Sequence, residues 1–428
     1  IDANGGVQPL VTLLCDETQG PSAKQHAAAA LCRLAQEKPK APADKDGRRA
    51  GAPAPAEAPA SDEGAVVEKV LSSAEVIARA GAIDPLVSLL SGDHGEEAQE
   101  EAAGALTALA RYESNRIEIS TKGGIGPLVA LLGSPNARAR EHAEFALVRL
   151  SIESSTRVLI IEQLVSMLKD DSGTDSQEQA AAALANLARE SVENRNSILK
   201  ADGIPSLLNL YDSTSRKAKE NSASAISQLA NKNRSNQNAI ANAGGIKKMV
   251  ATLISAQMNI KEISGLKLCT LIVEGIWHMA DGNAENQTAL YEEGCIPPIV
   301  ASLNNPDSQM QTNSSGALAC LSRGHPANQA AVARSGALAP LCTMVRDAAD
   351  SDTREEAAAA LWALAADNPQ NKSTIAKLGG LEPLVNMLIM GTTEKSAVNS
   401  AGALATLSAK HADNRQTIAK RIILVLGN

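Results

Sequence analysis

The chain has 428 residues, of which 44% are hydrophobic, 1% aromatic and 21% charged, with a formal net charge of −8 and a pI near 5.4. The hydrophobic fraction is ample for a buried core and excludes a disordered chain, and the acidic balance disfavours a general nucleic-acid binder. The six cysteines form no C-x-x-C pair, which predicts reduced thiols rather than a zinc site or a disulfide framework.

A glycine or glycine pair followed by an apolar run returns along the whole chain. Examples are "NGGVQPLVTLL" from Asn4, "AGAIDPLVSLL" from Ala80, "KGGIGPLVALL" from Lys122 and "LGGLEPLVNML" from Leu378. The commonest interval between copies, as from Pro298 to Pro340, is 42 residues. A phosphate-binding glycine loop occurs once per nucleotide site, whereas this element occurs about nine times. The repetition therefore predicts a corner between two helices.

Each unit shows the signals of three helices in a fixed order. An Asn, as in "NRIEI" from Asn115 or "NQNAI" from Asn236, is expected at the N-cap of a short first helix. A left-handed glycine then ends that helix, and proline stands in the first turn of the second helix. A polar loop leads to a third helix such as "EEAAGALTALA" from Glu100, whose Ala and Leu residues form an apolar stripe.

Three intervals depart from the period. The first contains residues 38–64, a tract rich in Pro, Ala and charge that predicts a disordered insertion. Residues 154–168 lack the glycine corner, so either two helices merge there or a few residues are missing. Residues 255–275 add about eight residues, for which we expect a lengthened second or third helix.

The ordered signals resemble armadillo repeats over nearly the whole chain. The resemblance implies an all-α fold, a right-handed α-solenoid of about nine three-helix repeats forming a single domain over residues 1–428. We expect this solenoid to be truncated at both ends, because the chain opens at Ile1 beside a glycine pair and stops soon after a new unit begins. "ALWALA" around Trp362 is similar to the scaffold branch that includes β-catenin, vacuolar armadillo proteins and plant armadillo domains.

In the armadillo family the third helices line a concave groove in which extended peptides bind. The resemblance implies partner-binding groove residues at Arg149, Asn186, Gln228, Trp277, His278 and Trp362, with Asn221, Asn313 and Asn399 on the other rail. Import adaptors of the importin α type carry a regular ladder of Asn and Trp in this groove. Here only Asn186 occupies the Asn position, and small residues such as Gly316 and Gly402 occupy the Trp position. This departure disfavours the import adaptors.

Charge is distributed unevenly along the chain. From residue 195 to 267, eleven basic residues face four acidic ones, whereas from 268 to 370 four basic residues face twelve acidic ones. A basic patch is expected at Arg216, Lys217, Lys219, Lys247 and Lys248. Such a patch would orient a partner of complementary charge, and the alternative is that these charges are solvated outer faces.

No catalytic motif, metal-ligand spacing or cofactor fingerprint stands out, so we expect no enzyme, no cofactor and no metal. The predicted function is a protein–protein interaction scaffold or adaptor that binds an extended or helical partner segment in the groove. The alternatives are a nuclear-import-type cargo adaptor and a structural subunit of a large assembly, such as a cytoskeletal complex. We expect a protein partner and a cytoplasmic location, with the nucleus as the alternative. A nucleic-acid partner is disfavoured because the chain has few aromatic residues on which bases could stack.

No apolar run in the sequence is long enough to span a membrane. Peripheral attachment to a membrane through a missing terminus stays open.

Overall fold

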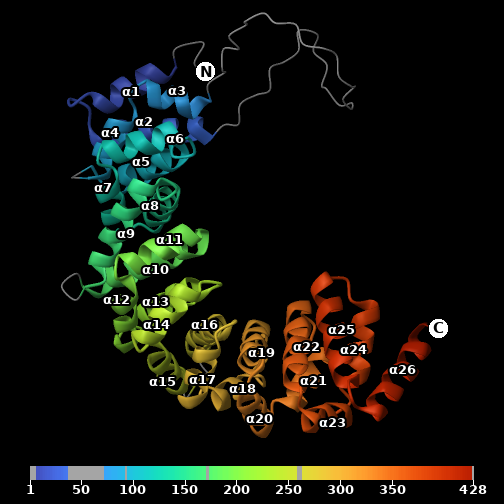
Figure 1. The fold of residues 1–428 in the computed structure, drawn as a ribbon. Helices are drawn as coiled ribbons and strands as arrows, with labels where there is room; N and C mark the ends of the chain where they lie inside the picture. The colour runs from blue at the N-terminus through green and yellow to red at the C-terminus, as the bar shows by residue number, and fades with distance from the viewer. Residues whose placement is uncertain (1–5, 37–71, 92–93, 170–172, 258–262, 427–428) are drawn as a thin grey trace, which may run out of the picture. The chain divides into compact units, whose positions relative to one another are not determined.

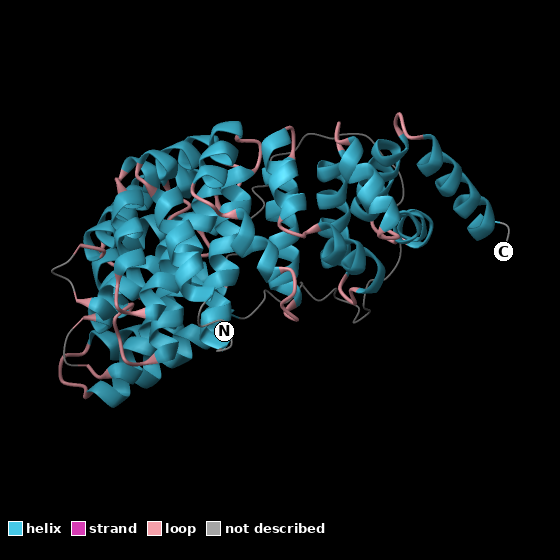
Figure 2. Cartoon of the chain, turned by 90° about the horizontal axis from the view of Figure 1, so that it is seen from below, coloured by secondary structure: helices cyan, strands magenta, loops and turns pink. Residues whose placement is uncertain are grey.

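The computed structural model describes residues 6–36, 72–91, 94–169, 173–257 and 263–426. All regular elements in these ranges are helices (Figures 1 and 2), which confirms the all-α prediction. The predicted insertion at residues 38–64 lies outside the described residues. None of the helices in the described ranges is long and apolar enough to cross a membrane.

Nine third helices recur at the spacing that the repeats predict among the described residues. They are α2 (Pro21–Gln36), α5 (Glu96–Leu109), α8 (Ala137–Leu150), α10 (Thr174–Glu190), α13 (Arg216–Ala230), α16 (Ile263–Ala280), α19 (Ser308–Ser322), α22 (Ser351–Ala365) and α25 (Glu394–Ser408). Each carries an apolar stripe of Ala and Leu or Ile that is buried in the core, as Leu106 and Leu361 are. This number agrees with the prediction of about nine repeats.

Shorter first and second helices alternate between the third helices. The first helices are α3 (Ser73–Arg79), α6 (Glu113–Thr121), α11 (Val192–Lys200), α14 (Arg234–Asn242), α17 (Ala284–Glu292), α20 (Pro326–Arg334), α23 (Pro369–Lys377) and α26 (Ala412–Leu426). The second helices are α1 (Val7–Cys15), α4 (Ile83–Leu90), α7 (Ile125–Leu131), α12 (Gly203–Asn209), α15 (Gly245–Gln257), α18 (Ile296–Ser302), α21 (Leu338–Asp347) and α24 (Leu381–Met390). The short 3₁₀ helix η3 (Leu210–Asp212) follows α12.

The irregular intervals have structural explanations. In the repeat without a glycine corner, the first and second helices merge into one helix, α9 (Ser154–Met167). In the repeat that contains residues 255–275, the second and third helices are both long, since α15 has 13 residues and α16 has 18. The expected lengthening is therefore confirmed on both sides of residues 258–262, which the structure does not describe.

The helices form two compact units, residues Ile1–Gln163 and Leu164–Asn428, with the boundary inside α9. In the first unit, α2 packs on α5 and α5 packs on α8. In the second unit, the third helices α10, α13, α16, α19, α22 and α25 pack in a row, each against the next (Figure 1). Each unit thus has its own row of third helices, and a single domain over the whole chain stays a prediction.

The glycine corner has the geometry that the sequence predicts. After α14, Gly244 adopts a φ of +77°, a left-handed conformation that is favourable for glycine. The next glycine, Gly245, packs so closely on the first helix that an added β-carbon would lie 2.6 Å from Ile240 Cγ2. At the equivalent corner after α11, Asp202 adopts the left-handed conformation in place of glycine, with a φ of 57°.

The prediction that the repeated Asn residues cap the first helices is wrong. In α14 the cap is Asn233, whose side chain accepts a hydrogen bond from the backbone N–H of Asn236. The repeated Asn lies three residues further on, is almost fully buried, and donates its side-chain amide to a backbone carbonyl at the end of the preceding third helix. This arrangement recurs, at 2.8–3.0 Å, at Asn115, Asn194, Asn236, Asn286, Asn328, Asn371 and Asn414. These Asn residues satisfy carbonyl groups that a helix end leaves without intrahelical partners.

The residue after the repeated Asn often reaches the next repeat. Gln237 donates to the His278 carbonyl at 2.8 Å, Gln287 to the Cys320 carbonyl at 2.8 Å and Gln329 to the Ala363 carbonyl at 3.0 Å. A first helix therefore ties the end of its own preceding third helix to the end of the following one. These hydrogen bonds hold neighbouring third helices in register.

Candidate functional site

Each third helix buries one central Leu or Ile, from which positions on that helix can be counted. These reference residues are Leu31, Leu106, Leu147, Leu184, Ile226, Ile276, Leu318, Leu361 and Leu404. We use the name third-helix face for the surface made, within one unit, by the residues two positions after and five positions before them. These positions are seven residues apart, about two helical turns, so they share one side of each helix.

The three predicted Asn residues of the second rail are engaged within the protein. Asn221 donates its side-chain amide to the Glu178 carbonyl at 2.8 Å, and Asn399 donates to the Glu355 carbonyl at 2.9 Å. Asn313 donates to the Thr270 carbonyl at 3.2 Å. In each case the acceptor belongs to the preceding third helix, so these Asn residues brace adjacent repeats. Their predicted contact with a partner stays a prediction.

Gln228 and His278, two of the predicted groove residues, lie at the junction of α13 and α16. Gln228 Nε2 is 3.4 Å from Glu274 Oε1, and His278 Nδ1 is 2.9 Å from the Ser227 carbonyl oxygen. Burial lowers the pKa of His278, although its contact with the Ser227 carbonyl and the nearby carboxylates act in the opposite direction. The ring is therefore neutral at neutral pH and holds α16 against α13.

Asn186, the one residue in the Asn position of the family ladder, lies half-buried on α10. Its Oδ1 atom accepts a hydrogen bond from Arg189 Nη1 at 2.8 Å. The two residues are three positions apart on the helix, so they lie on the same side of it. Asn186 thus presents its amide beside a guanidinium at the start of the row of third helices in the second unit.

Both tryptophans fill the junction to the next third helix. The Trp277 ring on α16 packs on Gly316 of α19, and the Trp362 ring on α22 packs on Gly402 of α25. A β-carbon on either glycine would lie within 2.7 Å of the indole ring. The two glycines that stand in the family's Trp position thus provide the surface on which an indole ring from the preceding third helix packs. Both indoles remain partly exposed on the second unit's surface.

Arg149 belongs to the first unit, apart from the other predicted groove residues. It is half-buried on α8, and its pKa is lowered by burial and by the nearby guanidinium of Arg111. Among the described residues, neither of the two arginines forms an ion pair through its side chain. Phe145, one turn before Arg149, is 52% exposed although it is the chain's one phenylalanine. The sequence-based prediction omitted Phe145, and its place two residues before the reference Leu147 could have revealed it.

The five residues of the predicted basic patch lie in two places in the second unit. Lys217 pairs with Glu178 at 3.5 Å, while Arg216 and Lys219, on α13, line a cavity of about 230 Å³. Lys248 pairs with Asp212 at 2.5 Å, and Lys247 lines a different cavity of about 490 Å³ together with three glutamates. Lys217 and Lys248 are therefore already paired within the chain. Partner steering by this patch stays a prediction.

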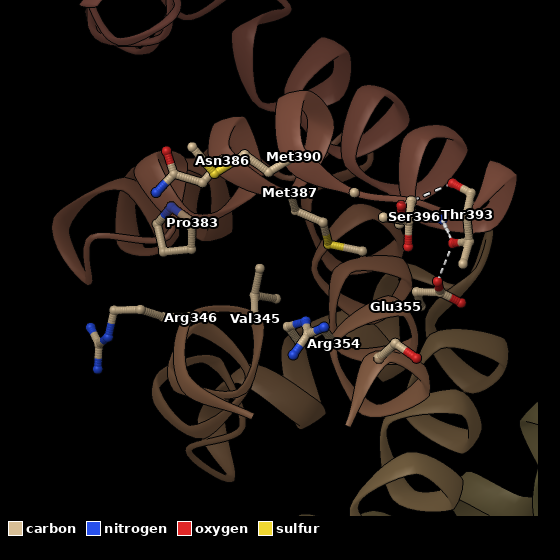
Figure 3. A pocket seen from close by; sticks show the side chains of 13 residues that line it. Val345, Arg346, Arg354, Glu355, Pro383, Asn386, Met387, Met390, Thr393 and Ser396 are labelled. Atoms are coloured by element: carbon tan, nitrogen blue, oxygen red, sulfur yellow. Dashed lines mark hydrogen bonds between the residues drawn. The ribbon is translucent and has the colours of Figure 1, made fainter. Parts of the chain in front are cut away.

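Two further cavities occur near α22, and the sequence-based prediction missed both. One, of about 280 Å³, is lined by Arg323, Gly324, Ala359, Trp362, Ala363 and Ala366. The other, of about 360 Å³, lies between α21, α22, α24 and α25, with Thr393 hydrogen-bonded to Glu355 on one side and Arg346 on the other (Figure 3). Neither could be read from residue spacing, because each is lined by residues of two adjacent repeats.

Comparison with known proteins finds similarity to armadillo-repeat proteins. The model of the Armadillo/beta-catenin-like repeat matches residues 73–111, 283–323 and 325–366. Human "Armadillo repeat-containing protein 3" is 33% identical over 141 residues, a stretch that is 32% of this chain and only 16% of that relative.

Solved structures extend the similarity over nearly the whole chain. The crystal structure of an engineered protein has a TM-score of 0.68 and 25% identity, and the match covers 97% of this chain and 92% of that one. A designed armadillo repeat protein, 23% identical, has a TM-score of 0.52 over 58% of this chain and 99% of its own length, which shows the shared fold.

Proposed function

Because the chain is an armadillo-repeat protein, we propose that it is a non-enzymatic interaction scaffold. In this proposal the third-helix face of the second unit binds an extended or helical segment of a partner protein. Armadillo repeats are typical of protein-interaction scaffolds, and the partner-binding role is the step that this proposal adds.

The observation that supports the proposal best is the row of six third helices in the second unit, α10 to α25, each packed on the next. Along this row the side chains of Gln228, Trp277, Trp362 and Thr406 are only partly buried. Polar groups alternate there with indole rings, and such rings are frequent anchors at protein interfaces.

The rigidity of the row favours binding as well. Asn221, Asn313 and Asn399 tie each helix to the preceding one, and Gln237, Gln287 and Gln329 tie the helix ends. A surface held by such hydrogen bonds loses little conformational entropy when a partner binds. We further propose a protein partner and a cytoplasmic location, as the sequence suggests.

The test is affinity capture from native lysate with the full chain, comparing wild type with Gln228→Ala/Thr406→Ala. Both substituted residues lie two positions after a reference residue, on α13 and α25. The matched control, Asn242→Ala/Thr392→Ala, removes the same kinds of group at exposed positions outside the third helices. Circular dichroism verifies that both variants are folded.

We expect the face variant to lose partners that the wild type and the control retain. The captured partner, once purified, should bind the face variant about tenfold more weakly, as expected when two interface side chains are truncated. Equal binding by all three proteins would contradict the proposal and point to another surface.

A further inference from the structure

The junctions between consecutive third helices follow a simple rule in part of the second unit. Where the residue after the reference is Trp, the residue two before the next reference is Gly. Trp277 thus packs on Gly316 between α16 and α19, and Trp362 packs on Gly402 between α22 and α25. The indole fills the junction, and the missing β-carbon makes room for it.

The junction between α19 and α22 lacks the indole. Its two equivalent positions are Ala319 and Ala359, so neither a ring nor a long side chain is present there. At this junction the structure has a cavity of about 280 Å³ lined by Arg323, Gly324, Ala359, Trp362, Ala363 and Ala366. Open space therefore occurs where the junctions on both sides of it hold a tryptophan ring.

The size and lining of the cavity limit what could occupy it. Small-molecule sites usually enclose about 300–1,000 Å³, so a volume of about 280 Å³ suits one large side chain better than a metabolite. Three alanines, a glycine and an indole make the lining largely apolar, and Arg323 is the one charged residue among those that line it. An aromatic ring fits this chemistry and could contact the Trp362 indole.

Arg323 lies at the end of α19 with a mostly exposed side chain. Its ion pair with Asp281 has a nitrogen–oxygen distance of 3.9 Å, which is long for a salt bridge, and an exposed pair of this kind contributes little stability. The guanidinium can therefore pair with an incoming carboxylate at small cost. A partner with an acidic group next to its aromatic side chain would satisfy both features.

Hydrogen bonds within the chain also hold the residues that line the cavity in place. Gln329 Nε2 donates to the Ala363 carbonyl at 3.0 Å and to the Ala366 carbonyl at 3.1 Å, which fixes the end of α22. The Trp362 ring packs on Gly402 of α25. A preformed apolar cavity of this kind favours binding because little has to be ordered when a ligand enters.

The cavity of about 360 Å³ in Figure 3 is a weaker candidate for a partner site. Its Arg354 guanidinium donates to the Ala348 and Ala349 carbonyls, its Arg346 pairs with Asp347, and its Glu355 accepts from Thr393. The charged groups there already have partners inside the chain.

We propose that the cavity between α19 and α22 takes an aromatic side chain of the partner segment, whose neighbouring carboxylate pairs with Arg323. This inference rests on the proposed scaffold function and names an anchor residue for the same face. The partner ring takes the place that Trp277 and Trp362 fill at the adjacent junctions.

The test uses N-acetyl-tryptophan, which carries an indole beside a carboxylate, as the probe. N-acetyl-tryptophanamide lacks the charge, and N-acetyl-alanine lacks the ring. Binding to the full chain is measured by NMR titration. We expect N-acetyl-tryptophan to bind with a dissociation constant of about 1 mM or below and the alanine derivative not to bind. Arg323→Gln should weaken binding of the carboxylate probe about two- to fivefold and leave binding of the amide unchanged.

Two variants close the cavity from the protein side. Ala319→Trp/Ala359→Gly rebuilds the junction that Trp277 and Gly316 form, and Ala363→Leu fills the same space with a smaller change. Ala401→Leu, the same substitution at an exposed site on α25, is the matched control. We expect both cavity variants to lose the probe, and the control to retain it, with the helical circular dichroism unchanged in all three.

Either of two results would overturn the inference: no saturable binding of N-acetyl-tryptophan to the wild type, or undiminished binding to a folded cavity variant. Partner capture that depends on Gln228 and Thr406 but not on the cavity would leave the scaffold function intact and refute only the aromatic anchor. If the face variant and the cavity variants all capture the partner as the wild type does, the scaffold face itself is refuted.

Discussion

The indole ring of Trp277 packs directly on Gly316, one repeat further along the chain. A β-carbon built on residue 316 would lie 2.5 Å from ring atom Cε2, closer than any real contact. The two residues lie on α16 and α19, so this contact sets how closely the two third helices approach.

Replacing this glycine tests the contact. We expect Gly316→Ala to lower the free energy of unfolding by about 1–3 kcal/mol, because the rigid ring cannot move aside without displacing a helix. The matched control is Gly275→Ala on α16, where the new β-carbon would meet the flexible tip of Met249 at 2.8 Å. Denaturant unfolding followed by tryptophan fluorescence reports on the second unit, which contains both tryptophans. Equal effects of the two substitutions would show that ring packing is unimportant.

The buried Asn residues of the first helices should contribute more to the free energy of unfolding than the exposed Asn residues of the same helices. Asn236 donates to the Leu229 carbonyl at 3.0 Å and to the Arg195 carbonyl at 3.3 Å. Asn236→Ala removes the donor from two carbonyls and should cost about 1–3 kcal/mol. The isosteric Asn236→Asp cannot donate and should cost at least as much. Asn242→Ala, at an exposed site of the same helix, should change the unfolding midpoint little.

The corner after α11 is occupied by a strained residue. Asp202 has a φ of 57°, whereas the equivalent corners use glycine, as at Gly244. Asp202→Gly should raise the free energy of unfolding by about 0.5 kcal/mol, and Asp202→Val should lower it by about 1–2 kcal/mol. Melting temperatures of the wild type and the two variants test this order of stability. A valine variant as stable as the wild type would show that this corner does not need the left-handed conformation.

Much of this fold could be predicted from the sequence because glycine at a positive φ and proline in a first turn are local requirements. Gly244 and Pro127 mark their corner and helix without any knowledge of the neighbouring repeats. The role of Asn236 was misassigned because the cap, Asn233, and the buried Asn lie three residues apart and both suit a helix N-terminus.

The candidate site was harder to predict. The pairing of Trp277 with Gly316 and the cavity beside Ala359 depend on residues about 40 positions apart in adjacent repeats. The signal was present, since each of the two repeats that carry Trp is followed by a repeat with glycine two positions before its reference residue. Its meaning requires knowing which faces of consecutive third helices meet. The bracing role of Asn221 has the same origin, because its acceptor belongs to the preceding helix.

His278 should make stability depend on pH. Its pKa is lowered in the folded state, chiefly by burial, with Lys232 acting in the same direction and the Ser227 carbonyl, Glu274 and Asp281 opposing. His278 therefore takes up a proton more readily in the unfolded chain than in the folded one. The stability that the neutral His278 ring contributes is fully present above about pH 6.5 and is lost as the pH falls below that value.

We expect the melting temperature of the wild type to fall between pH 7 and pH 5 by more than that of His278→Gln. The exposed His26→Gln variant should follow the wild type. A parallel decline in all three proteins would remove His278 as the cause.

The most direct measurement of the central claim places a photocrosslinking amino acid at residue 228 or 406 on the third-helix face, and at residue 242 outside it. With the captured partner bound to the full chain, crosslinks are mapped by mass spectrometry. If the partner binds the third-helix face, one contiguous partner segment crosslinks to residues 228 and 406, and residue 242 gives no crosslink. Crosslinks from residue 242 alone would contradict binding at this face and place the partner elsewhere on the surface.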